Sequence, residues 1–206
     1  MYVEMKHIEK NYGSFHASRD VSFGVDKGKL VALLGPSGSG KTTVVCALLA
    51  ALKKRGLSLT AFKSGPDYID PMFHRRVLDT PSYNLDLFLF GRGEKGAKAA
   101  RQLLVDHGER SDLVLLEGAM GYYDGVGTGH EASAYDVAAA TDTPVVLVVD
   151  GRGAGLTLGA GLKGLADFYK DSRVAGFIVN RVKPMVYAHF CLLYTSPSPR
   201  DSTSSR

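Results

Sequence analysis

Cysteine is scarce in this chain of 206 residues, which contains only Cys46 and Cys191. Two cysteines so far apart form neither a disulfide framework nor the paired spacing of a zinc site. Long apolar runs are also missing, since stretches such as Val145–Val149 are far too short to cross a bilayer. The opening residues MYVEMKHIEK lack the apolar core of a secretory signal. These absences predict a cytoplasmic protein in a reducing compartment.

Dense stripes of charge are missing as well. The formal net charge is +4, and the basic residues occur in small groups such as Lys53–Arg55 and Arg75–Arg76. A nucleic-acid surface is usually richer in Lys and Arg on one face. The sequence therefore predicts no nucleic-acid partner. The mild positive charge suits a site for a small anionic molecule, or no charged ligand at all.

The chain does contain enough apolar residues for one sizeable core. Hydrophobic residues make up 45% of it and charged residues 22%, which is ordinary for a globular α/β domain. Apolar runs alternate with helical patterns from Lys29 to about Val182. The predicted strands are Leu30–Leu34, Leu57–Phe62, Leu113–Leu116, Val145–Val149 and Val174–Val179. The predicted helices are Lys41–Arg55, Lys95–His107, Ser133–Ala140 and Leu156–Tyr169. This alternation predicts a mostly parallel sheet with helices on both faces.

The two ends of the chain do not follow this alternation. Residues 1–28 contain two short strand-like segments with polar turns, which predict a β-hairpin-like leader before the sheet. The Ser-, Pro- and Arg-rich residues 191–206 have almost nothing to bury, so we expect them to be disordered. The predicted main domain is thus residues 29–190.

The segment GPSGSGKT, residues 35–42, matches the P-loop pattern G-x4-G-K-[ST] between an apolar strand and an amphipathic helix. Its glycines let backbone N–H groups surround phosphates, Lys41 reaches the β and γ oxygens, and the Thr42 hydroxyl binds Mg²⁺. The following helix turns its positive end toward the same phosphates. The fold class is therefore a P-loop NTPase. The predicted ATP-binding residues here are Gly35, Ser37, Gly38, Ser39, Gly40, Lys41, Thr42 and Thr43.

Carboxylates follow three of the predicted strands. Asp67 comes after the second strand, Glu117 after the third and Asp150 after the fourth. Ligands of parallel α/β sheets bind beyond the carboxyl ends of the strands, so these groups should meet the P-loop at one edge. Asp67 and Glu117 are expected to complete an Mg²⁺ site with Thr42 and phosphate oxygens. The alternative for each acid is a solvated loop residue or a helix cap.

Five motifs between Gly38 and about Phe190 resemble the N-terminal synthetase domain of cobyrinic acid a,c-diamide synthases, in the dethiobiotin-synthetase-like group of P-loop enzymes. They occur in order over about three quarters of the chain. The motifs are FKSGPDYIDPMFH (Phe62–His74), SYNLDLFLF (Ser82–Phe90), LLEGAMGYYDG (Leu115–Gly125), PVVLVVDGRG (Pro144–Gly153) and AGFIVNRV (Ala175–Val182).

The resemblance implies an ATP-dependent carbon–nitrogen ligase of cobalamin biosynthesis. Such an enzyme uses ATP and Mg²⁺ to phosphorylate carboxylates of a corrin, and ammonia then displaces phosphate to leave an amide. By this resemblance Lys41, Asp67, Asp70 and Glu117 are catalytic, and Thr42, Asp67 and Glu117 hold the metal. Tyr68, Ile69 and Asp70 lie near the corrin substrate, and Asn180 meets adenine. The alternatives are loop packing for Tyr68 and Ile69, and a strand-end cap for Asn180.

Residues 1–43 instead resemble the opening of an ABC transporter ATPase, in which Tyr12 would stack on adenine. No LSGGQ-like signature follows, and Gly151 follows Asp150 where such an ATPase has its catalytic Glu. Residues 191–206 resemble translated sequencing-adapter read-through. We therefore expect a chimeric chain with a transporter-like leader, a synthetase body and an artefactual tail; a natural fusion is the alternative.

The family's full-length enzymes also have a glutaminase domain that supplies ammonia, and the sequence leaves no room for one. Cys46 and Cys191 lack the base that a nucleophilic cysteine needs, so free ammonia is the expected nitrogen donor. A homodimer is a further expectation. The alternative functions are an ABC transporter subunit that hydrolyses ATP beside a membrane partner, and an inactive nucleotide-binding chimera.

Overall fold

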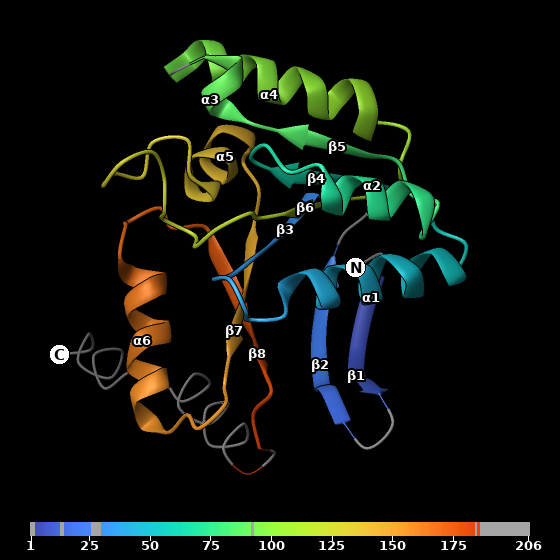
Figure 1. Cartoon of the computed structure of the whole chain (residues 1–206), viewed down its shortest axis with the longest axis vertical. Coiled ribbons are helices and arrows are strands. Elements are labelled where there is room, and N and C mark those ends of the chain that lie inside the picture. The colour runs from blue at the N-terminus through green and yellow to red at the C-terminus, as the bar shows by residue number, and fades with distance from the viewer. Residues whose placement is uncertain (1–2, 13–14, 26–29, 92, 184, 186–206) are drawn as a thin grey trace, which may run out of the picture.

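The computed structural model describes residues 3–12, 15–25, 30–91, 93–183 and 185, which form two sheets and six helices (Figure 1). The strands are β1 (Val3–Tyr12), β2 (Phe15–Val25), β3 (Leu30–Leu34), β4 (Leu59–Ser64), β5 (Ser82–Leu85), β6 (Leu113–Glu117), β7 (Val145–Asp150) and β8 (Val174–Asn180). The helices are α1 (Lys41–Lys54), α2 (Ile69–Arg76), α3 (Leu87–Phe90), α4 (Gly93–Gly108), α5 (Ala134–Thr141) and α6 (Leu156–Asp167).

The main sheet has six strands in the order β5-β4-β6-β3-β7-β8, and every neighbouring pair is parallel. The central strand β3 has the sequence LVALL, and its residues 31–34 are buried on both faces of the sheet. Such continuous apolar strands suit a parallel sheet that is covered on both sides. The predicted P-loop NTPase-like α/β fold is therefore confirmed.

Helices cover both faces of this sheet, and each face has its own core (Figure 1). On one face α1 buries Leu49 and Leu52 against strand residues such as Leu33. On the other face α4 and α5 contribute Ala100 and Val137 to a second core. Burying a leucine side chain contributes about 1.5–3 kcal/mol. These two cores hold the loops at the carboxyl edge in place.

Strands β1 and β2 form a separate antiparallel pair, with Val3 opposite Val25 and Tyr12 opposite Phe15. The predicted hairpin-like leader is thus confirmed as a pair of strands. The disorder expected for residues 191–206 falls outside the described residues. Within the part of the chain that the structure describes, no helix is both long and apolar enough to span a membrane.

Three short elements were not expected from the sequence. Helix α2 and strand β5 lie where neither a helix nor a strand was predicted, and α3 is a single turn that begins after the N-cap Asp86. Strand β4 also runs two residues later than predicted, to Ser64 instead of Phe62. The prediction stops at Phe62 because Lys63 and Ser64 are polar, but both residues are buried in the sheet. The later end of β4 brings Lys63 into the site described next.

Candidate functional site

The predicted phosphate-binding loop lies between β3 and α1 at the carboxyl edge of the sheet. Two of its glycines are required by close contacts: a Cβ on Gly35 would lie 2.1 Å from the carbonyl oxygen of Val148. A Cβ on Gly40 would lie 2.4 Å from Nδ2 of Asn180, and Gly40 has a φ of +85°, where side chains are strained. The loop is therefore pressed against β7 and β8, and only glycine fits at these two positions.

Lys41 is the first residue of α1 and is folded back onto the loop. Its Nζ donates hydrogen bonds to the carbonyl oxygens of Gly35, at 2.8 Å, and Ala119, at 3.0 Å. Burial, together with the nearby charge of Lys63, lowers the pKa of Lys41. Lys41 is thus placed beside the loop in the way that a phosphate-binding lysine requires.

The other predicted loop residues differ in exposure. Ser39 is buried, Gly40 and Thr42 are half-buried, and Ser37, Gly38 and Thr43 are exposed.

Thr42 and Glu117 meet, as predicted. The Thr42 hydroxyl donates to Oε1 of Glu117 at 2.5 Å, although the two residues come from α1 and the end of β6. Glu117 is completely buried. Burial raises the pKa of Glu117, although the opposite charge of Lys63 and the Thr42 hydrogen bond act against this shift. The pair forms a carboxylate–hydroxyl cluster at the start of α1.

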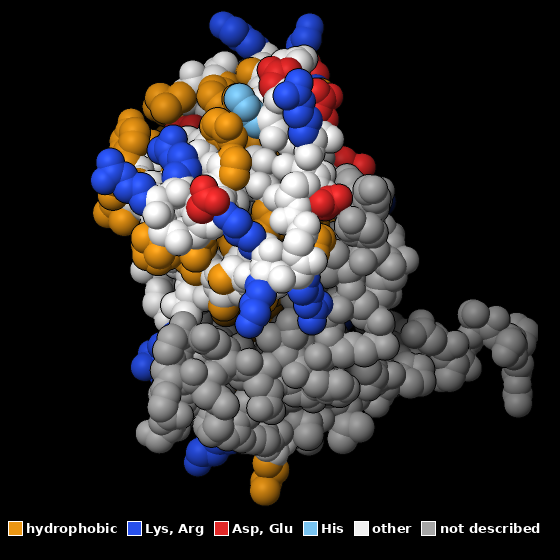
Figure 2. All heavy atoms as spheres, turned by 90° about the vertical axis from the view of Figure 1, so that its right-hand side faces the viewer, with side chains coloured by type: hydrophobic (Ala, Val, Ile, Leu, Met, Phe, Trp, Pro, Cys, Tyr) orange, Lys and Arg blue, Asp and Glu red, His pale blue; other side chains and the backbone are white. Residues whose placement is uncertain are grey.

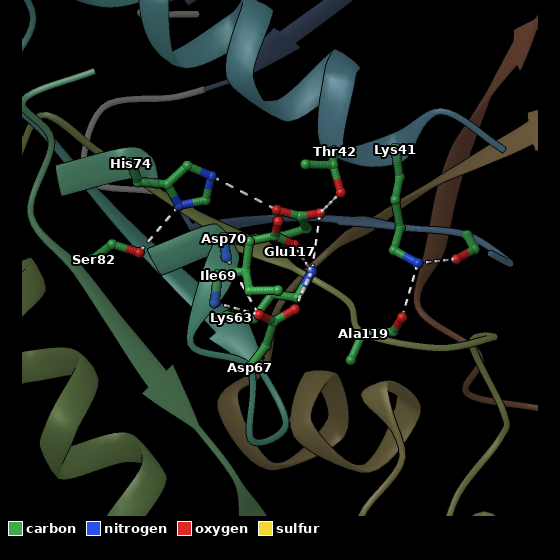
Figure 3. A network of polar contacts seen from close by, with 11 residues as sticks. Lys41, Thr42, Lys63, Asp67, Ile69, Asp70, His74, Ser82, Glu117 and Ala119 are labelled. Atoms are coloured by element: carbon green, nitrogen blue, oxygen red, sulfur yellow. Dashed lines mark hydrogen bonds and ion pairs between the residues drawn. The ribbon is translucent and has the colours of Figure 1, made fainter. Parts of the chain in front are cut away.

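Lys63 is a functional candidate that the sequence analysis missed. Its side chain is 2% exposed, and Nζ lies 2.5 Å from Asp70, 3.1 Å from Glu117 and 3.5 Å from Asp67 (Figure 3). Burial alone would lower the pKa of Lys63, but the carboxylates of Glu117 and Asp70 outweigh it and raise the pKa. Lys63 therefore stays charged. A lysine within the otherwise apolar stretch LTAFKS was the available sequence signal.

Asp67 and Asp70 converge on Lys63 from the turn before α2 and from its first turn. Oδ1 of Asp67 accepts hydrogen bonds from the backbone N–H groups of Ile69, at 2.9 Å, and Asp70, at 3.3 Å. Burial alone would raise the pKa of Asp67, but the Asp70 N–H and the Lys63 ammonium outweigh it and lower the pKa. Asp67 is therefore ionised and part of the same network as Glu117.

Tyr68 and Ile69 are 79% and 73% exposed, although the backbone N–H of Ile69 belongs to this network. Met72 and Phe73, one turn further along α2, are also exposed. Figure 2 faces the side of α1 and α2 and shows hydrophobic side chains in the upper part of the described surface, among Lys and Arg side chains. The predicted substrate residues Tyr68 and Ile69 therefore lie on an accessible, partly apolar surface next to the buried charges.

His74 is a second residue that the sequence analysis missed. It is completely buried on α2, one turn after Asp70, so both side chains face the sheet. Its Nδ1 lies 3.1 Å from Oγ of Ser82 on β5, and its Nε2 lies 3.8 Å from Oε2 of Glu117 (Figure 3). Burial lowers the pKa of His74, so the imidazole is neutral. The spacing of Asp70 and His74, four residues apart, would have revealed them if α2 had been predicted.

Asn180 ends β8 against the phosphate-binding loop. Its Nδ2 donates to the carbonyl oxygen of Ser39 at 2.8 Å, while its Oδ1 is buried with no hydrogen-bond partner among the described residues. Arg181 also donates from Nη2 to the carbonyl oxygen of Gly38. The end of β8 thus supports the loop from behind, and the predicted contact of Asn180 with adenine stays a prediction.

The donor set at this edge fits Mg²⁺ in part. Thr42 and Glu117 offer a hydroxyl and a carboxylate oxygen, Oε1, side by side. Mg²⁺ typically takes one or two carboxylates and completes its shell with water and phosphate oxygens. Asp67 faces Lys63 at 3.5 Å, so its role as a ligand stays a prediction. The described residues contain no cluster of three His, Cys, Asp or Glu side chains that could hold a metal alone.

Comparison with known proteins supports the predicted resemblance. Residues 30–190 match the family described as CbiA: CobQ/CobB/MinD/ParA nucleotide binding domain. A cobyrinate a,c-diamide synthase of Listeria innocua is 42% identical over 155 residues, which cover 75% of this chain and 33% of the relative. The synthase of Gloeobacter violaceus is 45% identical over 147 residues, which cover 71% of this chain and 31% of the relative. The chain thus spans about a third of the length of these relatives.

Solved structures show the same fold at low identity. FlhF complexed with GMPPNP and Mg²⁺ aligns with a TM-score of 0.56 and 16% identity, covering 84% of this chain and 64% of FlhF. The signal recognition particle 54 kDa protein of Aeropyrum pernix in complex with GDP aligns with a TM-score of 0.54 and 24% identity. The alignment covers 80% of this chain and 38% of that protein. These likenesses concern the fold alone.

Proposed function

The chain belongs to the CobQ/CobB/MinD/ParA nucleotide-binding domain family, and from this premise we propose that it uses ATP to amidate carboxylates of cobyrinate. The proposal draws on the synthases named above, of whose length the chain spans about a third. In the proposed reaction a carboxylate oxygen of the substrate attacks the γ-phosphorus of ATP, and ADP leaves. Ammonia then attacks the acyl carbon, a proton is lost, and phosphate leaves with the bonding electrons. The product is an amide.

One observation carries the proposal: two buried ammonium groups and a carboxylate–hydroxyl pair meet at one edge of the sheet. Lys63 lies 3.1 Å from Glu117, whose Oε1 accepts from Thr42, and Lys41, the neighbour of Thr42 in the chain, donates to the carbonyl oxygen of Ala119 (Figure 3). A carboxylate is a poor electrophile, and transfer of a phosphoryl group turns its oxygen into a leaving group. That transfer needs positive charge around the phosphoryl oxygens. The two lysines already lie at this edge of the sheet, so they provide such charge without a rearrangement of the protein.

Each residue at this edge has a distinct proposed role. Lys41 exchanges its two carbonyl partners for the β and γ oxygens of ATP, since its Nζ already lies on the loop. Lys63 stabilises the phosphoryl group in transfer. Thr42 and Glu117 would hold Mg²⁺, with Asp67 as a third candidate ligand. Bound Mg²⁺ would offset the charge of the phosphates.

The substrate is proposed to approach over the loop before α2. Asp70 holds Lys63 at 2.5 Å, and the exposed Tyr68 and Ile69 flank this position. Their exposed apolar surface suits a large ligand that carries its carboxylates at the periphery. Asn180 is proposed to meet adenine with its Oδ1, which is buried, has no hydrogen-bond partner among the described residues and would accept from the amino group of the base.

The test measures release of ADP from the full chain with ATP, Mg²⁺, cobyrinic acid and an ammonium salt. We expect ADP to appear only when cobyrinic acid is present, together with an amide product detected by mass spectrometry. Lys63→Met should lower the rate at least about a hundredfold, the effect of removing one donor from a charge-stabilising site. Lys53→Met is the matched control, because Lys53 is 41% exposed and pairs with Asp79 outside the site.

Two results would contradict the proposal. ADP release at the same rate without cobyrinic acid would indicate an uncoupled ATPase. ATP binding without any turnover would support the inactive nucleotide-binding chimera instead. Melting temperatures of the two lysine variants separate a lost chemical step from a lost fold.

A further inference from the structure

We propose that His74 is a positioning residue that donates a hydrogen bond from Nε2 to Oε2 of Glu117 and thereby orients the other oxygen, Oε1, toward Thr42 and Lys63. The inference rests on the proposed function, because Glu117 is there a ligand of the metal that accompanies the nucleotide. It assigns a role to a buried side chain that neither touches the nucleotide loop nor faces the substrate.

The two oxygens of Glu117 have unequal surroundings. Oε1 receives the Thr42 hydroxyl at 2.5 Å and lies 3.1 Å from the Lys63 ammonium. Oε2 has no hydrogen-bond partner among the described residues, although Glu117 is completely buried. A buried carboxylate oxygen without a partner is unfavourable, since it has lost the water that solvated it. A donor is therefore needed on the side of Oε2.

His74 is the donor that the fold provides. Its Nε2 is buried, lacks a partner among the described residues, and lies 3.8 Å from Oε2. A typical N–H···O hydrogen bond is about 2.9 Å long, so a shift of about 1 Å closes it. On its other side the ring contacts Ser82 of β5 through Nδ1. Two buried, unpartnered atoms of complementary type thus face each other.

The other nitrogen of His74 determines which tautomer is present. Nδ1 lies 3.1 Å from Oγ of Ser82, which can either donate or accept. With the proton on Nδ1, the lone pair of Nε2 would face the lone pairs of the Glu117 carboxylate. With the proton on Nε2, Ser82 donates to Nδ1 and Nε2 donates to the carboxylate, so both contacts are favourable. The geometry therefore selects the neutral Nε2–H tautomer.

The result is a polar chain from the edge strand to the nucleotide loop: Ser82 on β5, His74 on α2, Glu117 on β6 and Thr42 on α1 (Figure 3). Such outer partners of metal ligands fix the direction of the ligand's lone pairs, and their loss typically weakens metal binding 10- to 100-fold. With Oε2 held by His74, Oε1 remains in the direction of Thr42. His74 therefore acts through Glu117 and not on the substrate.

The first test uses Mn²⁺ as a paramagnetic probe, titrated into the full chain with saturating ADP and followed by electron paramagnetic resonance. His74→Gln places an amide nitrogen near the position of Nε2, whereas His74→Asn places it near Nδ1. We expect His74→Gln to bind Mn²⁺ within about threefold of the unchanged chain and His74→Asn to bind at least about tenfold more weakly. A residue that only fills space would make the two variants alike.

The second test reads the tautomer directly in the unchanged chain. Long-range ¹H–¹⁵N spectra of the histidine-labelled protein distinguish Nδ1–H from Nε2–H, and the signal absent from His74→Gln identifies His74. We expect the Nε2–H form. An Nδ1–H form, or equal Mn²⁺ affinities for the Gln and Asn variants, would overturn the inference. If the unchanged chain binds no ADP at all, the proposed function fails first, and the inference fails with it.

Discussion

The ammonium group of Lys63 is almost completely buried, and three carboxylates surround it. Asp67, Asp70 and Glu117 lie within 3.5 Å of its Nζ. A buried charge is tolerated only when it is paired and hydrogen-bonded. The carboxylates outnumber this ammonium, so the cluster retains negative charge that a metal ion or a second ammonium can balance. At the residue scale, the site is therefore suited to cations beside the phosphates of a nucleotide.

Gly40 provides a sharp test of how the phosphate-binding loop is supported. A Cβ at this position would lie 2.4 Å from Nδ2 of Asn180, which holds the loop through Ser39. We expect Gly40→Ala to displace Asn180 and to weaken ADP binding at least about tenfold, equivalent to about 1.4 kcal/mol. Isothermal titration calorimetry of the full chain measures this change.

The matched control for this substitution is Gly56, just beyond α1. Its φ of +84° is almost the same as the +85° of Gly40, but a Cβ there meets nothing within 4 Å. Backbone strain should therefore lower the free energy of unfolding of Gly56→Ala by roughly 1–2 kcal/mol. Its ADP binding should be unchanged. Equal ADP affinities for the two alanine variants would show that the contact with Asn180 does not support the loop.

At the scale of elements, long apolar strands and their helices could be predicted from the sequence, whereas short polar elements could not. The predicted range Leu30–Leu34 is the observed β3, and the predicted helix Ser133–Ala140 differs from α5 by one residue at each end. Strand β5, with only four residues, SYNL, has too little periodicity to be recognised. Such a strand forms because β4 pairs with it along the whole of its length.

Helix α2 explains why His74 was missed. Its sequence IDPMFHRR is short, mixes polar with exposed apolar residues and has a proline in its first turn, where proline is tolerated. The sequence motif indicated that Asp70 lies near the substrate. Only the helix shows that Asp70 and His74 share one buried face. Lys63 was missed for a related reason, because a charged residue after an apolar run predicts the end of a strand, whereas β4 continues through it.

The N-cap of α5 gives a prediction at the same scale. The Ser133 side chain accepts a hydrogen bond from the backbone N–H of Asp136 at 3.2 Å, and Ser133 is 2% exposed. Removing the hydroxyl leaves that N–H without its acceptor. We expect Ser133→Ala to lower the free energy of unfolding by about 1 kcal/mol in urea titrations.

Replacement by another capping residue is the control. Ser133→Asn keeps a side-chain oxygen that can accept from the same N–H, so its loss should be smaller than that of the alanine variant. An alanine variant as stable as the unchanged chain would mean that water or another group satisfies Asp136 N–H. Because α5 packs against the loop after β6, such a result would also mean that this cap contributes little to holding that loop in place.

For the whole molecule, the strand order explains why the site lies where it does. The chain leaves β3 through α1 toward β4, and it leaves β6 through α5 toward β7, on the opposite face of the sheet. The connections therefore diverge between β3 and β6, which are neighbours. Ligands of open α/β sheets bind at such a divergence. Lys41 follows β3 and Glu117 ends β6, so the two halves of the site meet there.

The same topology leaves β1 and β2 outside the six-stranded sheet. Within the described residues, these two strands form ladder hydrogen bonds only with each other. A two-stranded pair alone is marginally stable in water. We therefore expect a chain that begins at Lys29 to unfold cooperatively and to melt within about 4 °C of the full chain, a difference of about 1 kcal/mol.

Leu49→Ala is the control that shows the melting assay to be sensitive. Leu49 is fully buried between α1 and the sheet, so its loss should cost about 2–5 kcal/mol. If removal of residues 1–28 lowered the melting temperature as much as Leu49→Ala does, the strand pair would be part of the core. If it did not, residues 29–190 would be established as the unit that carries the nucleotide site. Every residue assigned to phosphate, metal and substrate lies within that unit.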